Sequence, residues 1–459
     1  MDGIAAVYSP GDSNLMENIF NATGSLQHRG KDGAGVCVGN KNNLYVHRDL
    51  GRIGNVLNGD LLDMMQGLGP VAAIGDVGYT KNRIAEKNNA EPLEVSPKGN
   101  TRYHISVAMD GCLINSDELR AELQDDYHFR TRNETEVVGA LLHKYISKEG
   151  INFSAGKKLV DKLHGRATFA LVALVNDGKE TYMVTLNDDR AFEPFCYGNI
   201  GNSFVVSSES CSHTRLAGDI KREFDGAEMA ICSSNGIEMQ RVREESMLPD
   251  VFQAVYFGHP ASLFGDVENF SIRTELGRGL FKIYGESSAD IVIPNPDSGW
   301  GVTMGLFEAY RDSLMDNAFD LSDTDNITIR DHKAFERFIG LTTVYPALIK
   351  QAQAVRTFQE AARRVRANEV GLKFGGIESL LRGKNVAMGD DSIVKGSVSE
   401  GGSVWVAHNA GIKKLEFWIS YAPMMFPSFK EWHRGEKCIR ELAVQRAFEN
   451  ETPYGKSID

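Results

Sequence analysis

Cysteine is scarce in this chain, and its few copies are spread out. Only six occur in 459 residues, and no two of them stand in a C-x-x-C pair. Zinc and iron–sulfur sites therefore lack their usual ligand spacing. Scattered thiols are typical of proteins from a reducing compartment, so we expect a cytoplasmic protein. The six are Cys37, Cys112, Cys196, Cys211, Cys232 and Cys438.

The sequence also lacks long apolar runs and an excess of positive charge, which narrows the range of possible partners. The most apolar run, residues 167–175, is far too short to cross a bilayer and predicts a core strand. The first residues show no basic region followed by an apolar stretch, so we expect no secretory signal and no membrane partner. The net charge of −12 argues against a nucleic-acid partner, because binding phosphates requires clustered Lys and Arg.

What is present suits a soluble chain with two or three domains. The sequence is 42% hydrophobic and 24% charged. Residues 1–240 hold short apolar runs separated by Gly, Asn and Asp, which predicts layered sheet. Asn133 with Glu136 three residues later predicts a capped helix start. We expect strands at 3–7, 71–74, 103–109, 167–175, 181–185 and 203–208, and helices at 14–23, 116–123, 134–147 and 157–163.

The second half, from about residue 265, alternates strands with helices. This order predicts a parallel, doubly wound sheet. We expect strands at 290–293, 385–389 and 415–420, helices at 302–312, 334–371 and 436–448, and a polar loop at 313–330.

One stretch, residues 382–397 (RGKNVAMGDDSIVKGS), carries the clearest chemistry. An apolar strand ends in Asp390 and Asp391, and a polar loop with Gly396 leads to a helix. Loop N–H groups and a helix N-terminus favour a phosphate. The two carboxylates suit vicinal sugar hydroxyls, or a divalent cation that bridges to them. An Asp-Asp pair alone is commonly a solvated turn, but the full order indicates a ribose 5-phosphate site.

The run from Asp390 to Ser397 resembles the phosphoribosylpyrophosphate (PRPP) loop of type I phosphoribosyltransferases. It is especially close to the loop Asp-Asp-Ser-Ile-Val-Arg-Gly-Thr of the glutamine PRPP amidotransferases, from which Lys395 and Ser397 differ. The same family is matched, in order, by LQHRGKDGAG at 26–35, DGCLIN at 110–115, YFGHPAS at 256–262, VIPNPDSG at 292–299 and RTF at 356–358.

This resemblance implies a fold of class α/β and α+β. Residues 1–240 are expected to form an αββα sandwich like that of N-terminal-nucleophile hydrolases, and residues 241–265 a linker. Residues 266–459 are expected to form a Rossmann-like type I phosphoribosyltransferase domain.

The resemblance also implies roles in the second domain. Asp390 and Asp391 bind the ribose hydroxyls, directly or through Mg2+, and act with Lys373 in catalysis. Asp297 and Ser298 lie where pyrophosphate or its Mg2+ binds, while Arg356 and Lys373 belong to a loop that closes over PRPP. A solvated helix face is the alternative for these two cations, and Ala352 replaces an expected arginine. The 5-phosphate loop comprises Ser392, Ile393, Val394, Lys395, Gly396 and Ser397.

The glutaminase half departs from the family. Asp2 stands where the nucleophilic cysteine is expected, and a carboxylate is a poor substitute for a thiolate. Gly78, after Asp76 and Val77, replaces the arginine that clamps the glutamine carboxylate. Asp110, before Gly111, replaces the oxyanion-hole asparagine and would repel a developing negative charge. Glu134 matches the acid that holds the glutamine amine.

We therefore expect a pseudo-glutaminase domain, in which Gly30, Gly33 and Gly35 serve turns. Asp250 and Ser428 stand at cysteine positions of cluster-bearing relatives, so no iron–sulfur cluster is expected.

The expected activity is transfer of phosphoribosyl from PRPP to ammonia or another amine, with Mg2+ and release of pyrophosphate, as at the entry to purine biosynthesis. A separate ammonia-supplying or amidotransferase partner and a homo-oligomer are also expected. The alternative is a non-catalytic paralogue that binds PRPP or nucleotide and regulates an active partner. The acceptor and the role of residues 313–345 stay open.

Overall fold

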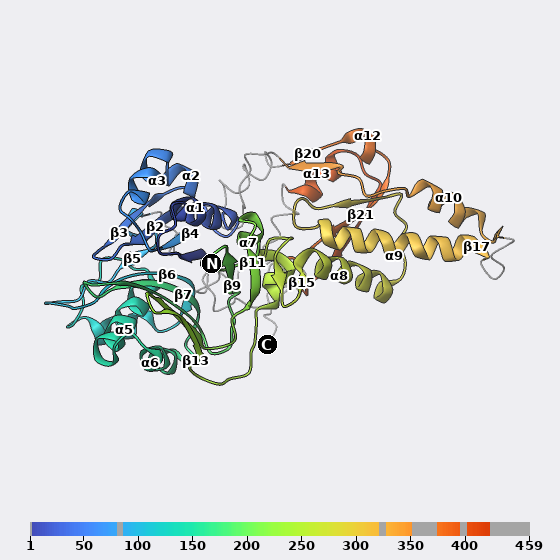
Figure 1. Ribbon diagram of the computed structural model, residues 1–459. Helices are drawn as coiled ribbons and strands as arrows, with labels where there is room; N and C mark the ends of the chain where they lie inside the picture. Colours follow the sequence, from blue (N-terminus) through green and yellow to red (C-terminus); the bar gives the residue numbers. More distant parts are fainter. Residues whose placement is uncertain (1, 80–85, 321–326, 351–373, 395–401, 423–459) are drawn as a thin grey trace, which may run out of the picture. The chain divides into compact units, whose positions relative to one another are not determined.

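The computed structural model describes residues 2–79, 86–320, 327–350, 374–394 and 402–422 (Figure 1). The chain forms two compact units. The first comprises Met1–Gln253 with Ala261–Asp266, and the second comprises Ala254–Pro260 with the chain from Val267 onward.

The first unit is built on two antiparallel sheets. The seven-stranded sheet has the order β11-β9-β10-β1-β4-β2-β3, and the six-stranded sheet the order β13-β12-β8-β7-β6-β5. The strands of the first sheet are β1 (Asp2–Tyr8), β2 (Gly33–Gly39), β3 (Leu44–Leu50), β4 (Ala72–Gly78), β9 (Cys196–Ile200), β10 (Ser203–Ser207) and β11 (Asp219–Glu223). Those of the second are β5 (Leu93–Glu94), β6 (His104–Leu113), β7 (Ala167–Asn176), β8 (Thr181–Asn187), β12 (Glu228–Ser233) and β13 (Gly236–Arg241).

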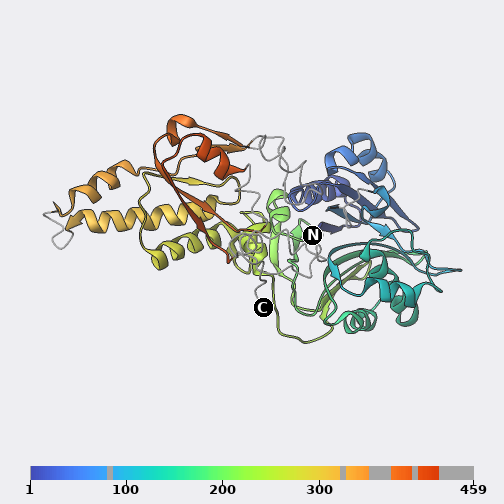
Figure 2. The same ribbon diagram turned by 180° about the vertical axis from the view of Figure 1, so that it is seen from behind.

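Helices cover the outer face of each sheet (Figures 1 and 2). The alternation along β1 shows why: Ala5 and Val7 face the helices, whereas Ile4, Ala6 and Tyr8 join the core between the sheets. The predicted αββα sandwich is confirmed. On the first sheet lie α1 (Leu15–Ser25), α2 (Ile53–Val56), α3 (Gly59–Gln66) and α7 (Cys211–Arg215), and on the second α4 (Ser116–Leu123), α5 (Glu134–Glu149) and α6 (Phe153–Leu163).

The start of α5 differs in detail from the predicted capping box. Asn133 caps the helix by accepting the N–H of Thr135. The Glu136 carboxylate, however, accepts the N–H groups of Arg130 and Thr131 and does not reach back to Asn133. The preceding loop therefore takes the bonds that the motif assigned to the cap.

The second unit has a parallel sheet of order β16-β21-β22. Ile293 and Met388 face α12 and α13, whereas Val292 and Ala387 face α8 and α9. Burial on both faces explains the continuous apolar runs and confirms the predicted doubly wound, Rossmann-like class. Its main elements are α8 (Asn269–Tyr284), β16 (Ile291–Pro294), α9 (Trp300–Ala318), α10 (His332–Gly340), β19 (Leu348–Lys350), β20 (Phe374–Gly376), α12 (Glu378–Leu381), β21 (Asn385–Asp390), α13 (Ser403–Asn409) and β22 (Lys414–Ile419).

Two predicted boundaries in the second unit were wrong. Residues 313–318 belong to α9, because Leu314 and Ala318 continue the buried stripe of Leu306 and Tyr310 at helical spacing. A hairpin of β17 (Phe319–Asp320) and β18 (Thr328–Ile329) follows. Of the predicted helix 334–371, α10 ends at Gly340, since β-branched residues and Pro346 follow and do not favour a helix. Residues 351–371 of that prediction lie outside the described residues.

The predicted helix 436–448 lies outside the described residues. Within the described residues, no helix combines the length and the apolar character that a membrane span requires.

Candidate functional site

The acidic pair of the second unit lies at the carboxyl end of its parallel sheet. Pro294 of β16 is in register with Gly389 of β21, so the loops that follow both strands leave from the same edge. Asp390 and Asp391 are each only 2% exposed. The strand pairing thus brings Pro294 next to Gly389, although 95 positions separate them in the sequence.

Asp390 is held by two neutral donors. Its Oδ1 accepts the N–H of Asp391 at 2.9 Å, and its Oδ2 accepts Nδ2 of Asn295 at 2.7 Å. Burial, and then the neighbouring Asp391, raise the pKa of Asp390 well above its usual range, while the two hydrogen bonds act in the opposite direction. Such a carboxylate favours a cation or hydroxyl donors.

The loop after β16 carries further polar groups. Asp297 forms an ion pair with Lys350 Nζ, at the end of β19. The N–H of Gly299 donates to the Asn295 carbonyl at 2.9 Å, where α9 begins next to Ser298. Sequence reasoning missed Lys350 and Asn295, because the strand pairing that positions them leaves no motif in the chain.

The remaining predicted residues of this site divide into two groups. Ser392 donates its hydroxyl to Asp391 Oδ1 at 2.6 Å, and Ile393 and Val394 follow it half-buried. The others lie outside the described residues, namely Lys395, Gly396, Ser397, Arg356 and Lys373.

A cavity in the first unit is lined in part by Asp2, Asp76 and Gly78, three of the residues predicted for the degenerate glutaminase site. It is lined by Asp2, Gly33, Asp76, Gly78, Tyr79, Asn89, Ala90, Glu91 and Asn133. Three of its carboxylates are almost fully buried, those of Asp2, Asp76 and Glu91. Glu91, which sequence reasoning missed, accepts the N–H of Met109 at 2.7 Å, so one of its roles is structural.

A buried arginine ties the start of β1 to the rest of this site. Arg29, 1% exposed, donates from Nε to the Asp2 carbonyl at 2.9 Å and from Nη2 to Asp110 Oδ2 at 2.6 Å. The Asp2 N–H donates to the other Asp110 oxygen at 2.8 Å. Both Asp110 oxygens thus accept bonds from within the fold, and Arg29 balances its charge. The expected repulsion by Asp110 is therefore weaker than the sequence alone suggested.

The same arginine has a second carboxylate partner. Arg29 Nη1 donates to Glu209 Oε1 at 2.7 Å, and His28 Nε2 lies 2.9 Å from the same atom. Burial raises the pKa of Glu209, but His28 and Arg29 lower it by more, so it lies well below its usual range. Arg29 and its partners form a closed network of buried charges, which sequence reasoning did not find because its members are far apart in the chain.

The glycines around this network serve close packing. A Cβ at Gly78 would collide with the Asp2 carboxylate, and one at Gly30 would collide with the Gly78 backbone. Gly33 and Gly35 lie within β2, so the expectation that they serve turns was wrong. Gly111, with φ of +152°, does need the freedom of glycine.

Glu134, matched above to the glutamine-amine ligand, lies in the first turn of α5. Its Oε2 accepts the N–H of Leu113 at 2.6 Å, which ties the end of β6 to the helix. Its neighbour Asn133, and not Glu134 itself, is among the residues that line the cavity.

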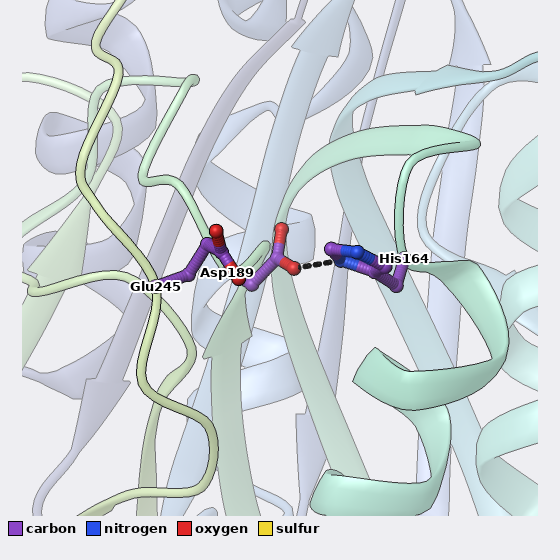
Figure 3. A group of neighbouring side chains, drawn as sticks. All are labelled: His164, Asp189 and Glu245. Atoms are coloured by element: carbon purple, nitrogen blue, oxygen red, sulfur yellow. Dashed lines mark hydrogen bonds and ion pairs between the residues drawn. The ribbon is translucent and has the colours of Figure 1, made fainter.

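A histidine and two acids also gather elsewhere in the first unit. Figure 3 shows His164 bonded to Asp189, with Glu245 beside them. These residue types can ligate a metal, but Arg243 Nε lies 3.3 Å from Asp189 Oδ2, and its Nη1 donates to Asp161 Oδ1 at 2.9 Å. Because the guanidinium already supplies the positive charge there, we interpret the cluster as an ion-pair network.

The five cysteines in the described part of the chain are buried and form no disulfide. Burial raises the pKa of both Cys37 and Cys211 to about 12, so these two thiols stay protonated at neutral pH.

Comparison with known proteins agrees with both halves of the chain. Residues 82–213 match a family model described as a glutamine amidotransferase domain. The amidophosphoribosyltransferase of Archaeoglobus fulgidus is 28% identical over 433 residues, covering 94% of this chain and 84% of that protein. The one from Methanocaldococcus jannaschii is 27% identical and covers 100% of this chain and 91% of the relative.

Solved structures give the same result. A structure described as the allosteric regulatory enzyme of purine biosynthesis matches with a TM-score of 0.74 at 25% identity, covering 93% of this chain and 82% of that one. The glutamine PRPP amidotransferase of Bacillus subtilis, complexed with ADP and GMP, matches with a TM-score of 0.72 at 24% identity, which supports the fold.

Proposed function

Because the chain is homologous to the amidophosphoribosyltransferases over nearly its whole length, we propose that its second unit is a PRPP-dependent phosphoribosyltransferase. It transfers the phosphoribosyl group to ammonia or another amine and releases pyrophosphate. The observation that carries this proposal is the buried Asp390–Asp391 pair, which meets the Asp297–Ser298 loop at one edge of the parallel sheet.

The residues suit this chemistry. Asp390 and Asp391 hold the ribose hydroxyls, and the run from Ser392 to Ser397 holds the 5-phosphate. Asp297 and Ser298 lie at the pyrophosphate end. Displacement at C1 requires little acid–base help; it requires charge stabilisation on pyrophosphate and exclusion of water.

The acidic pair also fits Mg2+. Among the described residues, Asp390 receives hydrogen bonds from neutral donors, and hard cations prefer carboxylate oxygens. Asp390 and Asp391 would hold the ion, which supplies charge neutralisation for the diphosphate when bound.

We further propose that the first unit does not hydrolyse glutamine. Asp2 supplies a carboxylate where a thiolate nucleophile is needed, and Gly78 has no side chain to bind the carboxylate of glutamine. Ammonia then reaches the second unit free in solution or from a separate protein.

The decisive experiment measures the thermal stability of the purified protein, and its release of pyrophosphate, in the presence of PRPP and Mg2+. Ligand that binds only the native state at a hundredfold excess over its dissociation constant stabilises it by about 2.7 kcal/mol. The Asp391→Asn variant should keep its fold, lose most of this thermal shift and abolish PRPP- and amine-dependent pyrophosphate release, because an amide carries no charge for the cation.

The matched control is Asp312→Asn, the same chemical change at an exposed position of α9. It should behave like wild type. A thermal shift without turnover with any amine would favour the regulatory alternative, and no shift at all would refute the phosphate-site argument.

The glutaminase proposal has its own test. Glutamine should yield no ammonia, since loss of a catalytic nucleophile in a hydrolase typically costs about six orders of magnitude. Glutamine hydrolysis at a rate comparable to that of an active amidotransferase would refute it.

A further inference from the structure

Asn295 occupies a junction between the two loops of the proposed PRPP site. It directly follows β16, and its N–H donates to the Gly389 carbonyl of β21 at 2.9 Å. Its own carbonyl accepts the N–H of Gly299 at 2.9 Å, at the start of α9. The backbone of Asn295 is therefore fixed by two neighbouring elements, which sets the point from which its side chain extends.

From this position the side chain of Asn295 makes a hydrogen bond to Asp390. Its Nδ2 donates to Asp390 Oδ2 at 2.7 Å, and the residue is only 5% exposed. Its Oδ1 is buried and accepts no hydrogen bond from the residues that the structure describes. Within the described part of the chain, the bond from Nδ2 to Asp390 is therefore the side-chain contact that sets the orientation of this amide, and it does so although an unsatisfied buried oxygen is costly.

The effect on Asp390 is to fix both carboxylate oxygens. Oδ1 accepts the N–H of Asp391, and Oδ2 accepts a hydrogen bond from Nδ2 of Asn295. The plane of the carboxylate is therefore defined before any ligand binds. The Asp390–Asp391 pair is a ligand for a divalent cation or for vicinal hydroxyls only if both carboxylates hold a set geometry, since displacements of about 1 Å weaken such sites strongly.

We propose that Asn295 is a positioning residue for the acidic pair, which orients Asp390 toward the ribose hydroxyls or the cation bound to them. This inference rests on the function proposed above. Residues 292–299 (VIPNPDSG) resemble the family stretch VIP-x-PDSG, and Asn295 stands at the variable position x. The inference gives this position a role. Asn295 acts through Asp390 and does not itself contact the reacting atoms.

The test compares Asn295→Leu with a matched structural control. Leucine has nearly the shape of asparagine but cannot donate to Asp390. The control is Thr303→Val, at the same junction: Thr303 is fully buried and its Oγ1 donates to the Gly299 carbonyl at 2.7 Å, but it makes no bond to either aspartate.

Asn295→Leu should raise the Mg2+ concentration for half-maximal PRPP-dependent stabilisation about tenfold, and the KM for PRPP similarly, because a hydrogen bond to a buried charge is lost. Thr303→Val should lower the thermal midpoint of the free protein without moving either value. Equal loss of stability in both variants with unchanged Mg2+ and PRPP dependence would overturn the positioning role.

A second measurement separates this inference from the proposed function. In crystal structures of the free protein, Asp390 should keep one orientation in wild type and Thr303→Val and lose it in Asn295→Leu. An unmoved Asp390 carboxylate in Asn295→Leu would overturn the inference whatever the ligand is. If PRPP does not stabilise the wild-type protein, the proposed function is overturned instead. A displaced Asp390 carboxylate in Asn295→Leu would even then support Asn295 as its positioning residue.

Discussion

The buried carboxylates of the two units differ in the charge of their hydrogen-bond partners. In the first, Asp110 and Glu209 are balanced by Arg29, a cation from the same unit. In the second, Asp390 is equally buried, but among the described residues its hydrogen-bond donors are an asparagine amide and a backbone N–H. The directions of the pKa shifts follow: that of Glu209 is lowered, and that of Asp390 is raised.

The first arrangement is that of a charge balanced within the fold, and the second leaves Asp390 available for the cation or the hydroxyls of the proposed function. A buried ion pair that is complete within the protein is costly to break but does not call for a partner. A buried carboxylate without a counter-charge destabilises the free protein, and binding a cation relieves that cost. The contrast fits the function proposed above, in which the second unit carries the transferase site and the first unit does not hydrolyse glutamine.

The largest effect is expected from breaking the Arg29 network. Arg29→Met leaves Asp110 and Glu209 as buried carboxylates without their guanidinium and removes the donor to the Asp2 carbonyl. The free energy of unfolding should fall by about 3–5 kcal/mol. Urea denaturation followed by far-UV circular dichroism would measure it.

Lys87→Met provides the control, because its ion pair with Asp49 is exposed to solvent and such pairs contribute little to stability. A loss in Arg29→Met no larger than in this control would contradict the assignment of the network to the fold.

A smaller loss of stability is expected from Gly78→Ala, and it should depend on Asp2, the other departure from the family at the predicted glutaminase site. In Gly78→Ala the new Cβ collides with the Asp2 carboxylate, which is itself buried, so we expect destabilisation by about 1–3 kcal/mol. Adding Asp2→Ala should relieve part of that loss, and a double-mutant cycle would measure the coupling. Gly24→Ala in α1, where the nearest atom is 3.7 Å away, should not destabilise the protein.

Additive costs in that cycle would mean that Asp2 and Gly78 changed independently. Coupling would mean that the Asp2 carboxylate now fills the space that a side chain at position 78 requires.

Particular residues show how far the sequence alone could lead. Alternating apolar residues in β1 and continuous apolar runs in β16 and β21 predicted the layers, because burial on one or two faces leaves a pattern in the chain. Asp390 and Asp391 were found because the loop is contiguous. Arg29, Glu209 and Asn295 were missed, since the side chains that Arg29 binds are 81 to 224 residues away from it, and Asp390 is 95 residues away from Asn295. No local pattern records such pairs.

The smallest predicted effect tests the comparison within the second unit alone. Glu416 of β22 is satisfied internally: Oε1 accepts the N–H of Ser288 at 2.9 Å and lies 2.9 Å from Lys414 Nζ, and Oε2 accepts the Ser287 hydroxyl at 2.7 Å. Burial raises its pKa, but these donors lower it by more, to about 2.

Because this folded-state pKa lies below the unfolded value, the Glu416 carboxylate stabilises the protein above about pH 4.5, and its contribution disappears as the pH falls toward 2. Wild type should therefore exceed Glu416→Gln in stability by about 1 kcal/mol at pH 6, and the two should converge near pH 2. All four tryptophans of the chain lie beyond residue 299, in the second unit, so their fluorescence during urea unfolding reports on this unit. A difference that stays constant from pH 6 to pH 2 would show that the charge of Glu416 contributes nothing, and that internal donors do not distinguish it from Asp390.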